Sequence, residues 1–275
     1  MAVLQAGAIR GEGVKGKIGR IGPSLIVVCL LCSTSDATSI VILANKMQIG
    51  IAADHKVTSR VRGVIEPDVC KIMSHGDFFF SFSGTVSKGG MYGAEFNVMD
   101  ILVKASKGLS DLSLIVERFD KLVAVPLQRQ IDIDYANHRE SFREQIGLVD
   151  SPVLELILFR VLASGTEMEQ SVFPADFRKT VRIKQPFHRA CRAGVGECQL
   201  TVGAQDGMME YIQEHPFTSD LAADAERLVE FERRRRPMDV GGKITVLLID
   251  SSGVHPADTS DKCPVEWRRS PPVPR

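Results

Sequence analysis

The sequence predicts an α+β protein in which helices cover stacked antiparallel sheets. Residues 38–83 contain four short apolar or aromatic segments joined by short connections, and such close succession is typical of antiparallel strands. Two segments with apolar residues at helical spacing follow, and the second half of the chain repeats the order of strands and then helices. Because the helices are grouped after strands and do not alternate with them, the order argues against a Rossmann-like parallel sheet.

The first half of the chain divides into a hairpin, two further strands and two helices. Residues 38–44 form a continuous apolar and β-branched run, and residues 49–54 return after a turn, so this pair predicts a hairpin. Further strands are expected at residues 69–73 and 78–83. Two helices are expected to pack on this first sheet, and their apolar residues are Met91, Phe96, Val98, Met99, Leu102 and Val103, then Leu112, Ile115, Val116, Phe119, Leu122 and Val123.

The second half of the chain predicts the remaining elements. Strands are expected at residues 153–163, 180–183, 200–204 and 244–250. Residues 185–197 read as a connection, residues 208–213 begin a helix, and residues 220–235 form an amphipathic helix that ends before Gly241-Gly242. Residues 253–275 are rich in proline and polar residues and are predicted to be a flexible tail.

The composition is that of an ordinary soluble globular protein. Hydrophobic residues make up 44% of the 275 residues and charged residues 25%, and 34 Lys and Arg balance 34 Asp and Glu. A neutral chain gives no reason to expect nucleic acid or an anionic membrane as a partner. The basic run at residues 233–236 ends a helical pattern, where cations complement the helix dipole, so it is interpreted as a solvated helix end.

Residues 1–37 are predicted to be a signal peptide or a propeptide. The apolar run at residues 25–32 is too short for a membrane helix, which needs about 20 apolar residues, but it suits the apolar region of a secretion signal. Ser35 and Ala37 form a small-x-small cleavage site, and cleavage there would leave Thr38 as the first residue. A buried strand, or a propeptide that the chain removes itself, is an alternative interpretation of the same run.

The six cysteines leave two alternatives open. Cys29 and Cys32 fall in the predicted leader, and Leu31 stands where a lipoprotein signal requires a small residue. Cys191 and Cys198 flank a turn-rich stretch, where they would pair in an oxidising compartment or remain two free thiols. A zinc site is not indicated, because no second pair of Cys or His has ligand spacing.

Thr38 is the central candidate residue because of its position after the predicted cleavage site. A threonine with a free α-amino group carries a nucleophile and a general base on one residue. Its hydroxyl is a weak nucleophile until a base takes its proton, and an α-amine with a pKa of about 8 can do so at neutral pH. Inside a longer chain, the same threonine would be an ordinary strand residue.

Three motifs resemble the proteasome β-subunit type of N-terminal-nucleophile (Ntn) hydrolase. The first is Thr38-Ser39-Ile40-Val41 together with residues 50–58, which contain Asp54. The second is Lys71-Ile72 followed by Phe82-Ser83-Gly84, and the third is the stretch 239–244 around the glycine pair. The likeness runs from Thr38 to about residue 250, so residues 38–252 are identified as one Ntn hydrolase-like domain.

This resemblance implies a four-layer αββα sandwich of two antiparallel sheets flanked by helices, and amide-bond hydrolysis. Thr38 would be the nucleophile, and Lys71 would lower the pKa of its hydroxyl or hold a proton. Asp54 would hold the Lys71 ammonium, and the backbone N–H of Gly84 would donate to the oxyanion. Taken singly, these residues have plainer interpretations: an ordinary ion pair or two solvated strand ends for Asp54 and Lys71, and a strand end for Gly84.

The leading hypothesis is a threonine-type peptidase or amidase that acts on a peptide or a small amide. The alternative is a catalytically inactive proteasome-like protein that binds or scaffolds, because Ala204 and Val240 stand where the family has serines. No cofactor, metal or nucleic acid is expected, and the resemblance allows a homo-oligomer. If the signal interpretation holds, the protein is exported to the periplasm or the extracellular space, and otherwise it is cytoplasmic.

Overall fold

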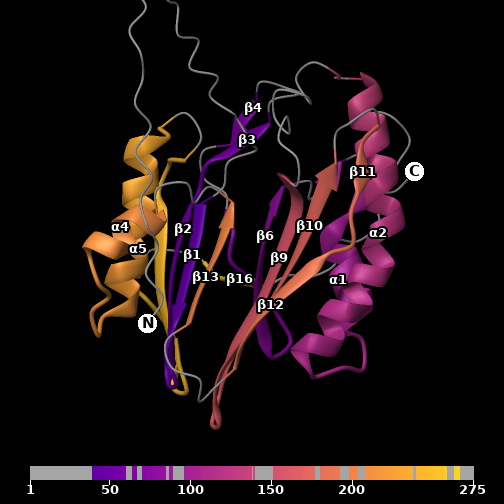
Figure 1. Cartoon of the computed structure of the whole chain (residues 1–275). Helices are drawn as coiled ribbons and strands as arrows, with labels where there is room; N and C mark the ends of the chain where they lie inside the picture. The colour runs from indigo at the N-terminus through magenta and orange to yellow at the C-terminus, as the bar shows by residue number, and fades with distance from the viewer. Residues whose placement is uncertain are drawn as a thin grey trace, which may run out of the picture. The chain divides into compact units, whose positions relative to one another are not determined.

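The computed structural model describes residues 39–59, 64–66, 70–84, 87–88, 96–137, 139, 151–176, 180–192, 198–203, 208–237, 240–258 and 263–266. The predicted leader, residues 1–37, and Thr38 lie outside these ranges. Within them, two antiparallel sheets face each other and helices cover the outer face of each sheet (Figure 1). This arrangement confirms the α+β class and the four-layer αββα sandwich.

The first sheet has the strand order β13-β1-β2-β14-β15. Its centre is the predicted hairpin of β1 (Ser39–Ala44) and β2 (Gln48–Asp54), which is antiparallel. Side chains of β1 alternate between two cores: Ile40 and Ile42 face the other sheet, whereas Val41 and Leu43 face the helices. The sheet is completed by β13 (Cys198–Gly203), β14 (Ile244–Asp250) and β15 (Gly253–Pro256).

The second sheet has the order β11-β10-β9-β6-β5-β16, and β12 also pairs with β10. Its strands are β5 (Met73–His75), β6 (Phe78–Gly84), β9 (Ser151–Leu162), β10 (Gly165–Asp176), β11 (Arg182–Ile183), β12 (Phe187–Arg192) and β16 (Val265–Glu266). Its described strands pair antiparallel, apart from β16, which runs parallel to β5. Small hairpins are formed by β3 (Val57–Ser59) with β4 (Val64–Glu66), and by β7 (Ser87–Lys88) with β8 (Phe96–Asn97).

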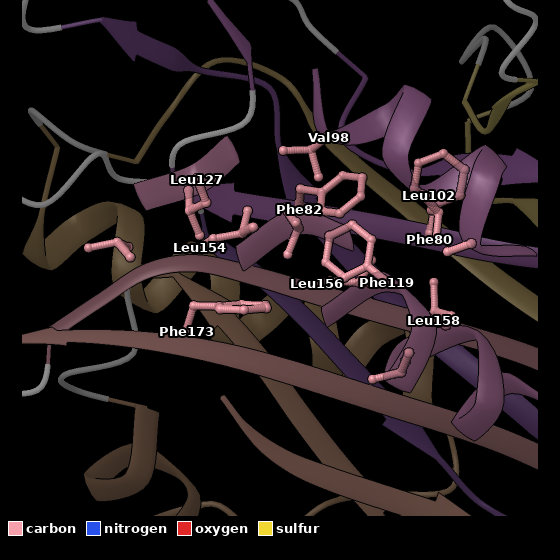
Figure 2. Close-up of a cluster of buried hydrophobic side chains, with 14 of the residues drawn as sticks. Phe80, Phe82, Val98, Leu102, Phe119, Leu127, Leu154, Leu156, Leu158 and Phe173 are labelled. Atoms are coloured by element: carbon pink, nitrogen blue, oxygen red, sulfur yellow. The ribbon is translucent and has the colours of Figure 1, made fainter. Parts of the chain in front are cut away.

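Helices α1 (Val98–Ser106) and α2 (Leu112–Asn137) cover the second sheet through an aromatic core (Figure 2). The ring centroid of Phe82 on β6 lies 6.1 Å from that of Phe119 on α2, which lies 6.4 Å from that of Phe173 on β10. The expectation that these two helices pack on the sheet of the first hairpin is therefore wrong. Helices and hairpin adjacent in sequence belong to different halves of the sandwich.

Helices α4 (Met208–Glu214) and α5 (Leu221–Arg235) cover the first sheet instead. Gly50 of β2 allows α5 to come close, because a Cβ at that position would lie 2.3 Å from the backbone carbon of Leu221. Asp220 begins α5 as its N-cap, and its carboxylate accepts a hydrogen bond from the N–H of Ala223 at 3.1 Å. The sequence predicts both helices, one that begins at residues 208–213 and an amphipathic one at residues 220–235.

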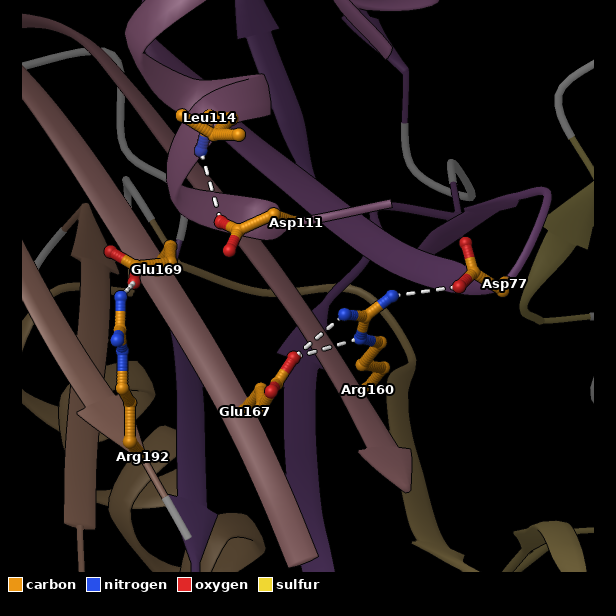
Figure 3. A network of polar contacts seen from close by, with 7 residues as sticks. All are labelled: Asp77, Asp111, Leu114, Arg160, Glu167, Glu169 and Arg192. Atoms are coloured by element: carbon orange, nitrogen blue, oxygen red, sulfur yellow. Dashed lines mark hydrogen bonds and ion pairs between the residues drawn. The ribbon is translucent and has the colours of Figure 1, made fainter. Parts of the chain in front are cut away.

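Strand β10 was not expected, because polar residues interrupt its apolar pattern. The structure pairs these residues with partners on other elements (Figure 3). Arg160 of β9 donates to Glu167 of β10 from Nε at 2.9 Å and from a terminal nitrogen at 2.8 Å, and to Asp77 at 2.7 Å. Ser171 of β10 donates to Asp120 of α2 at 2.8 Å. Such pairs allow polar residues to occupy a buried strand.

The stretch 185–197 was predicted to be a connection, but it contains a strand. Its residues Phe187–Arg192 form β12, which pairs with β10, and a disulfide joins Cys191 to Cys198. Of the two alternatives for these cysteines, the structure therefore contains the bridge.

The predicted flexible tail also differs from the structure over its first part. Residues Gly253–Pro256 form β15 on the first sheet, Val265–Glu266 form β16 on the second, and a disulfide joins Cys263 to Cys70. Residues 267–275 lie outside the described ranges. None of the helices in those ranges combines the length and the apolar character that crossing a membrane requires.

Candidate functional site

The candidate site lies at the end of the sandwich where β1 begins. Ser39, the first described residue of β1, pairs with Gly203 at the end of β13. Asp54, the last residue of β2, pairs with Ile244 at the start of β14. Thr38 lies outside the described residues, and Ser39 is the residue that follows it in the sequence.

Asp54 is a fully buried carboxylate with hydrogen-bond donors from three parts of the chain. Its Oδ1 accepts from the backbone N–H of Ser39 at 2.8 Å and from Nζ of Lys71 at 2.7 Å. Its Oδ2 accepts from the backbone N–H of Gly241 at 3.2 Å, and its exposed fraction is 0%. A buried carboxylate is tolerated when a cation and further donors compensate its lost hydration. Asp54 thus joins the start of β1, the lysine and the Gly-Gly turn.

Lys71 is the buried cation of this pair, with an exposed fraction of 7%. Its Nζ also donates to the backbone carbonyl of Lys56 at 2.7 Å, and the backbone carbonyl of Lys71 accepts a hydrogen bond from the hydroxyl of Ser81 on β6 at 2.6 Å. Burial lowers the pKa of Lys71 below its ordinary value, and the charge and hydrogen bond of Asp54 oppose that shift. The interpretation of Asp54 and Lys71 as two solvated strand ends does not fit, because both side chains are buried together.

Gly84 occupies a position that only glycine fits without strain. Its φ angle is +90°, and a Cβ built there would lie 2.4 Å from the carbonyl oxygen of Val153 on β9. The preceding residue, Ser83, pairs with Glu155 of β9. Gly84 is thereby placed at the same end of the sandwich as Glu155, which contacts the first sheet there.

Glu155 is a buried acid at this end that the sequence interpretation missed. Its Oε2 accepts a hydrogen bond from the N–H of Gly203 at 2.7 Å, and its exposed fraction is 4%. Burial raises its pKa to about 7, while the hydrogen bond from Gly203 and the charge of Arg189 act in the opposite direction. The sequence did contain an indication of this acid, because Glu155 is the one charged residue inside the apolar run 153–159.

Replacing Glu155 with Gln is expected to flatten part of the pH dependence of stability. The raised pKa means that the folded state binds more protons than the unfolded state between pH 4.5 and about pH 7. The free energy of unfolding therefore falls as pH rises through this window, by about 3 kcal/mol for a shift of this size. Urea unfolding at pH 4 and pH 8 should show this loss in the wild type and not in Glu155→Gln.

A matched control for this measurement is Glu226→Gln, at an exposed position on α5. It should change the free energy of unfolding by less than about 0.5 kcal/mol at either pH. A wild-type pH dependence equal to that of Glu155→Gln would contradict the raised pKa of Glu155.

Val240 and Ala204 are the two positions at which the sequence resemblance leads one to expect serine. Val240 is fully buried in the apolar core between α5 and the first sheet, so no hydroxyl is available there. Ala204 lies outside the described residues. The next residue after Val240, Gly241, still contributes its backbone N–H to Asp54.

A disulfide lies next to the Asp54–Lys71 pair. Cys70, the neighbour of Lys71 in sequence, is bonded to Cys263, and the Sγ of Cys263 lies 4.0 Å from Nε2 of His55. His55 follows Asp54 and its Nε2 lies 2.5 Å from the hydroxyl of Thr245. The segment that was expected to be a tail thus packs against the residues next to both members of the Asp54–Lys71 pair.

Comparisons with known proteins add a likeness of shape. Among solved structures, the chain is similar to an Anbu (Gly-1) mutant from Hyphomicrobium sp. strain MC1, with 12% sequence identity and a TM-score of 0.42 over 82% of this chain and 89% of that chain. No protein-family model and no curated protein matches the chain.

Proposed function

We propose that this protein is an amide-bond hydrolase that uses Thr38, as the first residue of the mature chain, as its nucleophile. The observation that carries the proposal is the buried Asp54–Lys71 pair, whose carboxylate also accepts a hydrogen bond from the N–H of Ser39. The hydrogen bond from the N–H of Ser39, the residue after Thr38 in the sequence, to this buried ion pair supports a role for the Lys71 cation in catalysis. The sequence motifs that contain Thr38, Asp54 and Lys71 support the same role.

In this mechanism the α-amine of Thr38 takes the proton of the Thr38 hydroxyl as its oxygen attacks the amide carbonyl. The Lys71 ammonium stabilises the developing alkoxide, and Asp54 holds the ammonium in place. The backbone N–H of Gly84 donates to the oxyanion of the tetrahedral intermediate. The protonated amine then gives its proton to the leaving amine, and a water activated by the same α-amine releases the acyl group from Thr38.

The two disulfides support export of the protein. Disulfides persist in oxidising compartments and are rare in the cytosol. The bridges Cys70–Cys263 and Cys191–Cys198 therefore agree with a secretion signal in residues 1–37. Signal cleavage after Ala37 would then generate the free α-amine that the mechanism requires.

The experiment that tests the proposal is identification of the mature N-terminal residue. The full chain is expressed with a C-terminal tag, and the purified protein is analysed by N-terminal sequencing and intact mass. We expect a chain that begins at Thr38. A wild-type protein that begins at any other residue would exclude the α-amine mechanism.

The variant Thr38→Ala distinguishes cleavage by a signal peptidase from self-cleavage as the source of a chain that begins at Thr38. If a signal peptidase cuts after Ala37, the variant should be shortened at the same bond as the wild type. If the chain cuts itself with the Thr38 hydroxyl, the variant should keep residues 1–37. The cleavage route can therefore be determined separately from the hydrolytic activity.

A second candidate function is a catalytically inactive protein that binds or scaffolds. The observation that favours it is the burial of Val240 in an apolar core, where the resembling family has a serine beside the amine. This candidate predicts a mature protein that begins at Thr38 and does not hydrolyse any member of a panel of fluorogenic peptide amides.

A further inference from the structure

A groove of about 350 Å³ lies between helix α2 and the segment that contains strand β11, and its lining includes neither Asp54 nor Lys71. Its walls are mostly apolar. The apolar lining consists of Ala124 and Val125 of α2, Phe173 of β10, Ile183 of β11, and Pro186. Sites for small molecules are typically clefts of about 300–1,000 Å³ with mostly apolar walls and a few polar groups. The groove therefore has the size and lining of a site for a small apolar chain.

Hydrogen bonds fix the two walls of the groove relative to each other. The side chain of Gln128 on α2 accepts from the N–H of Ile183 at 2.9 Å and donates to the carbonyl of Val181 at 3.0 Å. The N–H of Lys184 donates to the carbonyl of Pro174 on β10 at 2.8 Å. Because these bonds join α2, β10 and β11 to one another, a ligand would enter a preformed groove and would lose little affinity to ordering it.

The groove runs from the buried core to an exposed apolar side chain. Phe173 at its base has an exposed fraction of 0%, whereas Val125 at its edge is 61% exposed. An exposed apolar side chain beside a cleft with apolar walls is a common feature of binding sites. A bound aliphatic chain would remove the surface of Val125 from water, which is favourable in proportion to the apolar area covered.

The charged residues of the lining are both cations. Arg129 is exposed on α2, and Lys184 follows β11. Among the described residues that line the groove there is no acid, and Asp132 on the same helix is hydrogen-bonded to Gln128. A guanidinium offers paired N–H donors that match the two oxygens of a carboxylate. Apolar walls with a cationic edge are complementary to an amphiphile that carries one negative charge.

We propose that this groove binds a medium-chain fatty acid as its free carboxylate. The aliphatic chain lies along the apolar walls between Val125 and Ile183, and the carboxylate pairs with Arg129 at the edge. This binding site is independent of the hydrolysis proposed above, because it contains none of the residues assigned to that reaction.

Calorimetric titration of the purified protein with hexanoate, octanoate and decanoate tests the apolar part of the site. Affinity should rise about fourfold for each added methylene, which is the effect of burying one such group. Decanol has the same chain without the charge and should bind about 10-fold more weakly than decanoate, since it lacks a hydrogen bond between charged groups. Equal affinities for the three carboxylates, or no binding of any of them, would overturn the proposal.

The variant Arg129→Gln tests the charged part of the site. It should bind decanoate about 10-fold more weakly than the wild type and bind decanol equally well. Lys121→Gln is the matched control, because Lys121 is exposed on the same helix and is not part of the lining, so decanoate binding should not change. Equal losses in the two variants would exclude the pairing with Arg129. Binding to phosphatidylglycerol vesicles without binding of monomeric decanoate would assign the surface to a membrane and overturn the proposal.

Discussion

Replacing Lys71 with Met is expected to lower the free energy of unfolding by about 3–5 kcal/mol, the loss found when one partner of a buried ion pair is removed. Met retains most of the volume, so the loss comes from the charge. Asp54 would keep its bonds from Ser39 and Gly241 but would lose the cation that compensates its burial. Because small domains are stable by only about 5–15 kcal/mol, chemical unfolding should show a large shift of the midpoint.

Two further variants decide whether charge is the cause. The double variant Asp54→Asn/Lys71→Met has no buried charge, and its asparagine can still accept from Ser39, so it should recover at least half of the lost stability. Lys243→Met breaks a partly exposed pair with Asp258, with nitrogen and oxygen 3.1 Å apart, and should cost less than about 1 kcal/mol. A double variant that loses the sum of the two single effects would contradict this explanation.

Replacing Gly84 with Ala is expected to cost about 3 kcal/mol or more, because two penalties act at one position. The φ angle of +90° is unfavourable for a residue with a Cβ, which costs about 1–2 kcal/mol. The added Cβ would also lie 2.4 Å from the carbonyl oxygen of Val153, so the paired strands must separate. By analogy with overpacked cores, this separation costs about 1–3 kcal/mol more. The N–H of Gly84 would move with them, so hydrolysis should fall as well.

Gly76→Ala is the matched control for this variant. Gly76 also has a positive φ angle, +63°, but a Cβ there would have no heavy atom within 4 Å. It should therefore show the conformational penalty alone, about 1–2 kcal/mol, with activity preserved. Equal losses for the two variants, measured by urea unfolding, would exclude the contact with Val153 as a cause.

Much of the fold could be predicted because it follows local patterns. The hairpin of β1 and β2 is a pair of apolar runs joined by a short turn, and α5 has a clear apolar face with Asp220 as its cap. Strand β10 could not be predicted in this way. Its polar residues are stabilised by partners such as Arg160 and Asp120, which belong to other elements, so the pattern of the strand alone is misleading.

The same distinction between local patterns and long-range contacts applies to the residues of the site. Asp54 and Lys71 could be named from the sequence because they stand in motifs that resemble those of a known family, and their side chains lie 2.7 Å apart in the structure. Glu155 and the Cys70–Cys263 bridge depend on contacts between residues 48 and 193 positions apart in the chain. Local periodicity contains no information about such contacts.

The most direct measurement for the central claim is the position of a covalent label. The mature protein is treated with a β-lactone, which acylates an activated hydroxyl, and is then digested and analysed by mass spectrometry. The Thr38 mechanism predicts one added probe on the peptide that begins at Thr38, with no label at that peptide in Thr38→Ala. A label on another residue, or equal labelling of the wild type and Thr38→Ala, would contradict it.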